Sequence, residues 1–246
     1  MNNDSTLATA VTAMGDGFGA DYRMPPLREQ VYGYLKRRLN DGKLKPGAFL
    51  DLNALGADLG LSRTPLRDAL LRLEAEGFVT IHARRGVVVN ALDISAIRNS
   101  YQLLGALEAS AIKEAAVRFS TEDAERMLAL NERMRASLFL NDFDDYYEAN
   151  LAFHDVYLSM SSNAELKRMV KILKERLYDF PRLEGYLSQW EQASIEEHDE
   201  LARRLLSASY ENAATFARDV HWSFEVQERF IMAYYFAREA ALGFTT

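Results

Sequence analysis

The chain has 246 residues, of which 48% are hydrophobic and 26% are charged, an ordinary composition for a folded globular protein. This length suits two domains better than one. The absence of cysteine excludes disulfides and thiolate metal sites and favours a cytoplasmic location. No run approaches the roughly 20 apolar residues of a membrane span. The first residues also lack the basic start of a signal peptide, so we expect a protein that is neither exported nor embedded in a membrane.

The formal net charge of −7 is unevenly distributed along the chain. Residues 25–90 carry 11 Lys and Arg against 7 Asp and Glu, whereas residues 91–246 carry 17 against 26. A basic N-terminal part joined to an acidic body suits a small nucleic-acid-binding module. A charge excess of this size is also common on ordinary solvated surfaces, so it does not decide the question.

The N-terminal part reads as a short run of helices followed by a hairpin. Residues 1–24 lack apolar periodicity and are expected to form a flexible tail. A helix is predicted from Pro25-Pro26 to about residue 39 by apolar residues at helical spacing. Two short helices follow, over 54–59 with Asp51 or Asn53 as cap and over 64–76 with Ser62 as cap. Residues 78–90 predict two β-branched strands around a basic tip.

The start of the second short helix gathers polar and basic side chains. Arg63 and Arg67 are four residues apart and project on one face, from which arginine can pair with guanine in a major groove. The N-terminus of a helix also favours phosphate. The predicted DNA contacts are Ser62, Arg63, Thr64 and Arg67, together with Arg84, Arg85 and Gly86 at the hairpin tip. Two arginines at this spacing are more often a solvated stripe, so the pattern alone leaves both interpretations open.

Beyond Asn90 the strand pattern disappears, and residues 91–246 are predicted to form an all-α bundle of six to seven helices. The whole chain is therefore expected to be mainly α, with one domain at 25–90 and a second, all-helical domain at 91–246. The predicted helices cover residues 94–119, 121–140, 142–161, 164–177, 192–207 and 210–236.

Three of the four histidines, His154, His198 and His221, fall on separate predicted helices of this body. Asn150 precedes His154 by one turn and shares its face. Three imidazoles and an oxygen could bind Zn or Ni and leave a position open for an organic anion. Spaced 44 and 23 residues apart, however, the histidines form no local metal motif. Separate surface or core roles for them therefore remain open.

Residues 26–90 resemble the winged helix-turn-helix of the GntR family. The resemblance lies in KLKPG at 43–47, the run from Leu52 to Leu70, and LEAEGFV at 73–79. It implies a homodimer that reads a palindromic double-stranded operator through Arg63, Thr64 and Arg67, with residues 84–86 as the supporting wing. Asn53 stands where many relatives have arginine, so one DNA contact is expected to be missing there.

Residues 95–236 resemble the FCD effector domain of the FadR subfamily, through Leu-Glu at 107–108, Phe-His at 153–154 and the EHDEL run at 197–201. In its VanR-like metal-binding branch, the ligand positions correspond to Asn150, His154, His198 and His221, with Asn replacing Asp. Leu104 replaces an arginine that would pair with an effector carboxylate, leaving Arg98, Arg182 or the metal for that role. The predicted effector contacts are Tyr101, Leu104, Arg98 and Tyr157, although aromatic residues at helical spacing are also ordinary core.

Together these patterns predict a transcriptional regulator, a repressor by analogy with most such proteins, that responds to a small molecule such as an organic acid. Two other classes of protein are consistent with parts of these patterns. A metal enzyme is disfavoured because the chain has no nucleophile motif, glycine-rich phosphate loop or HExxH helix. A helical interaction protein with an incidental basic corner would show no ligand-modulated DNA binding.

Overall fold

The computed structural model describes residues 25–40, 42–83, 85–179 and 187–236. The predicted tail at 1–24, Arg84 and Arg182 lie outside the described residues. The chain divides into two compact units, one running to Leu92 and the other holding most of the described residues from Asp93 onward.

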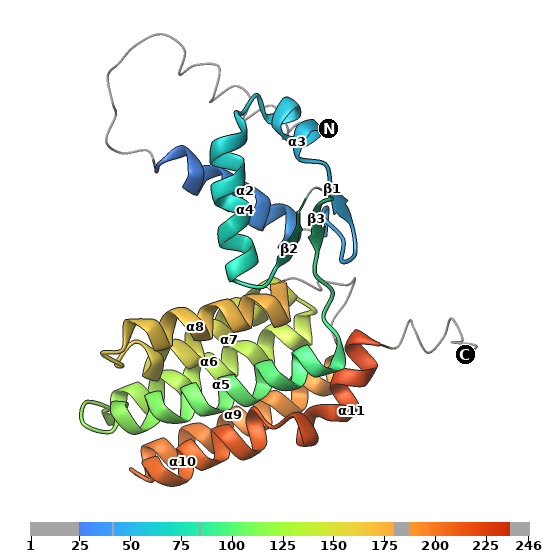
Figure 1. The fold of residues 1–246 in the computed structure, drawn as a ribbon. Helices are drawn as coiled ribbons and strands as arrows, with labels where there is room; N and C mark the ends of the chain where they lie inside the picture. Colours follow the sequence, from blue (N-terminus) through green and yellow to red (C-terminus); the bar gives the residue numbers. More distant parts are fainter. Residues whose placement is uncertain (1–24, 41, 84, 180–186, 237–246) are drawn as a thin grey trace. The chain divides into compact units, whose positions relative to one another are not determined.

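The described residues of the first unit form three helices and a small antiparallel sheet (Figure 1). The helices are α2 (Leu27–Asn40), α3 (Leu52–Leu59) and α4 (Arg63–Ala75), and the strands are β1 (Phe49–Leu50), β2 (Val79–His82) and β3 (Gly86–Val89). The strand order is β1-β3-β2. The predicted three helices and hairpin are confirmed, whereas β1 was not predicted. Its two residues form a strand only because they pair with β3, Phe49 opposite Val88 and Leu50 opposite Val87.

Local sequence builds the corner between α3 and α4. Asp51 is the cap of α3, since its Oδ1 accepts hydrogen bonds from the backbone N–H groups of Asn53 at 2.8 Å and Ala54 at 3.2 Å. Gly60 ends the helix in the left-handed conformation, with φ of 62°. Ser62 occupies the cap position of α4, but its side chain makes no capping hydrogen bond.

Apolar packing and one polar cluster hold α4 against α2. The buried core is formed by apolar residues of both helices and of the strands, namely Val31, Leu35, Leu39, Leu66, Leu70, Leu73, Phe78, Val79, Val87 and Val89. At its edge, the guanidinium of Arg72 lies 2.6 Å from Glu29 and 3.0 Å from Glu76. The hydroxyl of Tyr32 donates to Glu76 at 2.6 Å. These contacts hold α4 in place against α2, so the face of α4 opposite the core has a fixed orientation.

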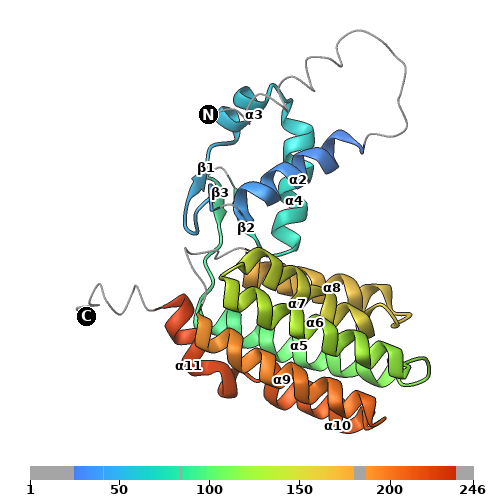
Figure 2. The ribbon, with the colours of Figure 1, turned by 180° about the vertical axis from the view of Figure 1, so that it is seen from behind.

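All the regular structure described in the second unit is helical. Its α-helices are α5 (Ile94–Ala115), α6 (Thr121–Leu140), α7 (Phe143–Leu158), α8 (Ala164–Lys174), α9 (Ser188–Leu206), α10 (Tyr210–Phe216) and α11 (Phe224–Tyr235), with π-helical segments η1 (Glu175–Asp179) and η2 (Ala217–His221). Both views show the long helices side by side (Figures 1 and 2). The helix α6 packs against α7 and α9, while α5 contacts α7, α8, α10 and η2. None of the described helices combines the length and apolarity needed to traverse a bilayer.

The expectation of one continuous helix over 210–236 is wrong. The helix α10 stops at Phe216, η2 follows, and α11 begins after Ser223, whose side chain accepts from the backbone N–H of Val226. Tertiary packing accounts for the break, because η2 lies directly against Gly105 of α5. A Cβ at Gly105 would lie 3.2 Å from the carbonyl oxygen of Arg218. Residues 210–223 contain no proline or glycine that would have indicated this interruption.

Candidate functional site

The first turn of α4 carries an exposed group of polar and basic side chains. Ser62, Arg63, Thr64 and Arg67 are all exposed, whereas Leu66 and Leu70 of the same helix are buried in the core. The first turn contains no acidic residue. One face of α4 therefore packs, and the other presents positive charge beside the unpaired N–H groups of a helix start.

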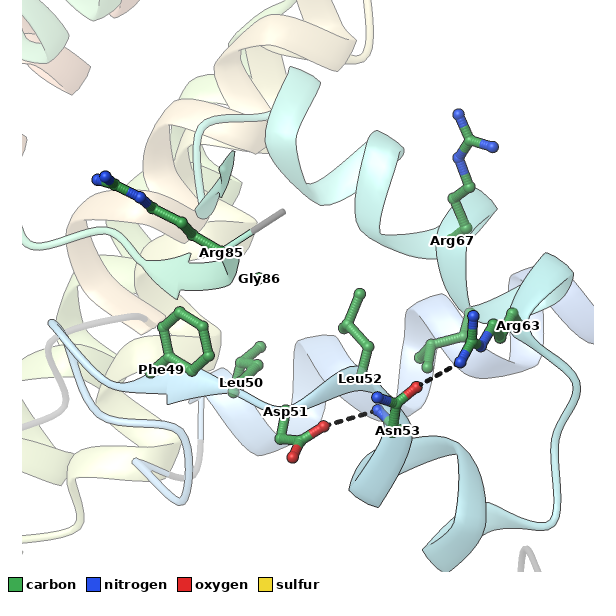
Figure 3. Close-up of a pocket in the computed structure, with 10 residues that line it drawn as sticks. Phe49, Leu50, Asp51, Leu52, Asn53, Arg63, Arg67, Arg85 and Gly86 are labelled. Carbon is green, nitrogen blue, oxygen red and sulfur yellow. Dashed lines mark hydrogen bonds between the residues drawn. The ribbon is translucent and has the colours of Figure 1, made fainter. Parts of the chain in front are cut away.

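A hollow of about 460 Å³ opens beside this turn (Figure 3). It is lined by the starts of α3 and α4, by β1 and by the hairpin tip, through Phe49, Leu50, Asp51, Leu52, Asn53, Arg63, Leu66, Arg67, Arg85 and Gly86. Three of the lining side chains are arginines. Within the part of the chain that the structure describes, Arg67 and Arg85 have no ion-pair partner, so their charges are available to an anionic ligand.

Asn53 is not simply a lost contact. Its Oδ1 accepts a hydrogen bond of 3.0 Å from the guanidinium of Arg63, ten residues away (Figure 3). An arginine at position 53 would instead set two like charges beside each other. Asn53 therefore helps to orient Arg63, a role that the sequence analysis did not foresee because it depends on the packing of α3 against α4.

Gly86 allows the hairpin tip to approach β1 closely. Its φ of +100° disfavours any residue with a side chain, and a Cβ there would lie 2.3 Å from Cζ of Phe49. The Phe49 ring is 58% exposed at the edge of the hollow. The position of Arg85, the neighbour of Gly86, thus depends on both of these residues.

In the second unit, the structure brings together the three histidines that lie far apart in the sequence. His154 of α7, His198 of α9 and His221 of η2 each offer one ligand atom, and these atoms lie within 4.8 Å of one another. All three rings are buried. Asn150 lies on α7 one turn before His154 and is partly buried.

Carboxylates stand behind two of the three rings. Nδ1 of His154 lies 2.9 Å from Oε2 of Glu108, and Nδ1 of His221 lies 2.8 Å from Oε2 of Glu197. Because an ionised carboxylate only accepts hydrogen bonds, these contacts place the ring proton on Nδ1 and leave the lone pair on Nε2. Metal-ligating histidines are commonly held in this way.

His198 differs from the other two. Both of its ring nitrogens are buried, and neither has a hydrogen-bond partner among the described residues. A buried polar group without a partner costs about 1–3 kcal/mol. A divalent cation between the three rings would satisfy one of these nitrogens, so the donor set fits a metal.

Burial also keeps the rings of His154 and His198 neutral. It lowers the pKa of His154 to about 4 in spite of the opposing effect of Glu108. It likewise lowers the pKa of His198 well below the ordinary value, and the other two histidines act in the same direction. Neutral imidazole is the form that binds metal, so no proton has to leave His154 or His198 near neutral pH.

Glu108 is fully buried at the back of the cluster and is surrounded by donors. Besides His154, its Oε2 accepts from Tyr157 and from Nε1 of Trp222 at 2.9 Å, and its Oε1 forms an ion pair with Nζ of Lys174 at 2.8 Å. Burial alone would raise the pKa of Glu108, but His154 and Lys174 outweigh it and hold that pKa well below its usual range. Sequence reasoning recognised Glu108 only as part of a motif and overlooked Lys174.

The predicted effector contacts separate into two groups. Tyr101, Leu104 and Tyr157 are buried in the bundle, and the Tyr101 ring packs edge-on against Trp222 beside His154. Arg98 is about half exposed and pairs with Glu225, and among the described residues no hydrogen bond or ion pair joins it to the histidines.

Comparison with known families assigns both units. Residues 27–89 match the model for bacterial regulatory proteins of the gntR family, and residues 99–220 match the FCD domain. The chain belongs to the GntR family. Among curated GntR-type relatives, the Nta operon transcriptional regulator of Aminobacter aminovorans is 29% identical over 174 residues, covering 70% of this chain and 80% of the relative. The HTH-type transcriptional repressor RspR of Escherichia coli is 24% identical over 131 residues, 53% of this chain. The match spans only 58% of the length of RspR.

Solved structures of GntR-type proteins share the fold. Escherichia coli McbR/YncC aligns with a TM-score of 0.64 at 24% identity, over 87% of this chain and 100% of that one. A GntR regulator from Rhodococcus sp. RHA1 aligns with a TM-score of 0.55 at 21% identity, over 77% and 90%. The matched families and relatives are regulators and not enzymes, in agreement with the prediction from sequence.

Proposed function

We propose that this GntR-family chain is a transcriptional repressor that binds double-stranded operator DNA as a homodimer. A small-molecule effector, an organic acid, would modulate that binding from the FCD domain. The observation that carries the proposal is the exposed arginine-lined turn at the start of α4, which has a rigid support behind it and a hollow beside it.

In this proposal the start of α4 enters a major groove. Arg63 and Arg67 contact base edges, and Ser62 and Thr64 contact phosphate together with the helix N-terminus. The wing, residues 84–86, lies on the neighbouring backbone or minor groove. Two copies would read half-sites separated by about one helical turn of DNA, roughly 34 Å. Repression is carried over from RspR, which is named a repressor.

The FCD domain would bind a divalent metal, Zn or Ni. His154, His198 and His221 would hold it, with Asn150 as a fourth donor through its amide oxygen. When bound, the metal supplies a Lewis-acid site for an anionic effector. Tyr101, Leu104 and Tyr157 would form apolar and hydroxyl walls beside it, while Arg98 remains a prediction as a carboxylate partner.

The DNA-binding part is tested by selecting duplexes from a randomised DNA library with the full chain and measuring their affinity by fluorescence anisotropy. Arg63→Ala should weaken binding of the selected duplex by about 1–3 kcal/mol, which is roughly 5- to 150-fold in Kd. The circular dichroism spectrum should not change. Arg28→Ala is the matched control, since Arg28 is exposed on α2 and its replacement removes the same charge. Failure to enrich any duplex, or equal effects of the two substitutions, would refute the assignment.

The metal part is tested by elemental analysis of the purified protein. Replacing both His198 and His221 with Ala should remove the bound metal, whereas equal metal content in variant and parent would reject the site. Anisotropy with and without a chelator then shows whether the site communicates with the operator.

A further inference from the structure

The inference concerns the ion pair behind His154 and rests on the proposed metal site. Glu108 is 0% exposed and Lys174 is 5% exposed. One carboxylate oxygen of Glu108 lies 2.9 Å from Nδ1 of His154, and the other lies 2.8 Å from the ammonium of Lys174. The ammonium also lies 5.3 Å from the centre of the Trp222 ring, which itself flanks His154 and His221. A full positive charge is therefore built into the surroundings of three histidines.

The two charges of this pair should act on a bound dication in opposite ways. A carboxylate behind an imidazole holds the ring orientation, keeps the proton on Nδ1 and makes Nε2 a stronger donor. A buried ammonium in the same surroundings repels the metal, and this repulsion is poorly screened away from water. Removing either partner also leaves the other charge buried alone.

The other carboxylate of the cluster has a different partner. Oε1 of Glu197 accepts a 2.8 Å hydrogen bond from the amide of Gln227, which carries no charge. With Glu108 and Glu197 ionised, a dication would be fully neutralised only if Lys174 were absent. With Lys174 present, the set formed by the metal, Glu108, Glu197 and Lys174 keeps one positive charge, and Asp155, whose charge also acts on Lys174, is exposed to solvent.

We propose that Glu108 and Lys174 set the metal affinity in opposite directions. Glu108 is a positioning residue that fixes the tautomer of His154 and strengthens metal binding. Lys174 is a counter-cation that weakens it and stabilises the metal-free form, so that the site exchanges its metal rather than retaining it permanently.

The test is the affinity of full-length metal-free protein for Co²⁺, measured by competition with a chelator, with the visible spectrum of Co²⁺ reporting the ligand set. Glu108→Gln should weaken binding by about 10- to 100-fold. Lys174→Met should tighten it by on the order of tenfold and leave the spectrum unchanged. Lys174→Arg should retain the parent affinity. Lys171→Met, an exposed lysine on the same helix, is the matched control and should have no effect.

Opposite signs for the two substitutions are the decisive result. If the ion pair were merely structural, removing either partner would weaken Co²⁺ binding. A Lys174→Met protein whose Co²⁺ affinity is lower than or equal to that of the parent would therefore overturn the inference. If Glu108→Gln fails to fold, Lys174→Met and Lys174→Arg still decide it.

A second measurement needs no metal. The ¹⁵N spectrum of the imidazoles in metal-free protein should show His154 protonated at Nδ1, both in the parent and in Lys174→Met. A parent His154 protonated at Nε2 would overturn the positioning role of Glu108. Absence of Co²⁺ binding by the parent would reject the metal site itself. If the parent binds Co²⁺ but Glu108→Gln and Lys174→Met change the affinity in the same direction, only the opposing roles of Glu108 and Lys174 are rejected.

Discussion

His198 provides the sharpest test of whether the histidine cluster serves binding rather than folding. Both ring nitrogens are buried without partners among the described residues, and the ring is 0% exposed. A residue retained for stability would not be left in this state. Replacing it with leucine, which has a similar bulk and no polar atoms, should therefore stabilise the metal-free protein.

The magnitude follows from the two unpaired nitrogens. Each unpaired nitrogen destabilises the folded protein by about 1–3 kcal/mol. Leucine does not fill the site perfectly, and this imperfect packing destabilises the variant by about 1 kcal/mol. The two nitrogens together cost about 2–6 kcal/mol, so the free energy of unfolding of His198→Leu without metal should exceed that of the parent by about 1–5 kcal/mol. With metal at about 1,000 times its Kd the parent gains roughly 4 kcal/mol, so this difference shrinks by that amount and changes sign wherever it is below about 4 kcal/mol.

Thermal unfolding of both proteins, in excess chelator and in excess Zn²⁺, measures these differences, with about 2–4 °C in Tm for each kcal/mol. His82→Leu, at an exposed position on β2, is the control and should retain the stabilisation by metal. A His198→Leu protein that is less stable than the parent in chelator would show that His198 is an ordinary core residue.

Three further predictions concern the wing, the π-helical segment and pH. Gly86→Ala should weaken DNA binding about tenfold or more with little change in the FCD domain, because the new Cβ meets Phe49 and the φ of +100° becomes strained; anisotropy and metal content together check this. Gly105→Ala should push η2 away and lower the affinity for Co²⁺, read by chelator competition, while DNA binding by metal-free protein stays unchanged. Burial raises the pKa of Glu191 from 4.5 to about 7, so the unfolded chain ionises first and stability is lost as pH rises through this window. Glu191→Gln should remove that loss, up to about 3 kcal/mol at pH 8 in urea unfolding, and the exposed Glu196→Gln should leave it in place.

Most of the DNA-binding unit follows from the sequence by itself. The cap at Asp51, the left-handed Gly60 and the apolar spacing of α4 act within a few residues, so local chemistry determines these helices and their ends. The shared face of Arg63 and Arg67 could also be predicted from the sequence, because residues four apart on a helix lie on the same side.

The tertiary structure decided the remainder. No periodicity joins His154 to His198 and His221, and only the packing of α7, α9 and η2 closes the cluster to 4.8 Å. The parts played by Glu108 and Lys174 depend on burial and on distances across helices that are remote in sequence. The break after Phe216 and the two-residue strand β1 exist because a distant partner, Gly105 or β3, makes that backbone conformation favourable. Interactions of this kind arise only when the chain has folded, so a linear pattern names the residues but cannot place them.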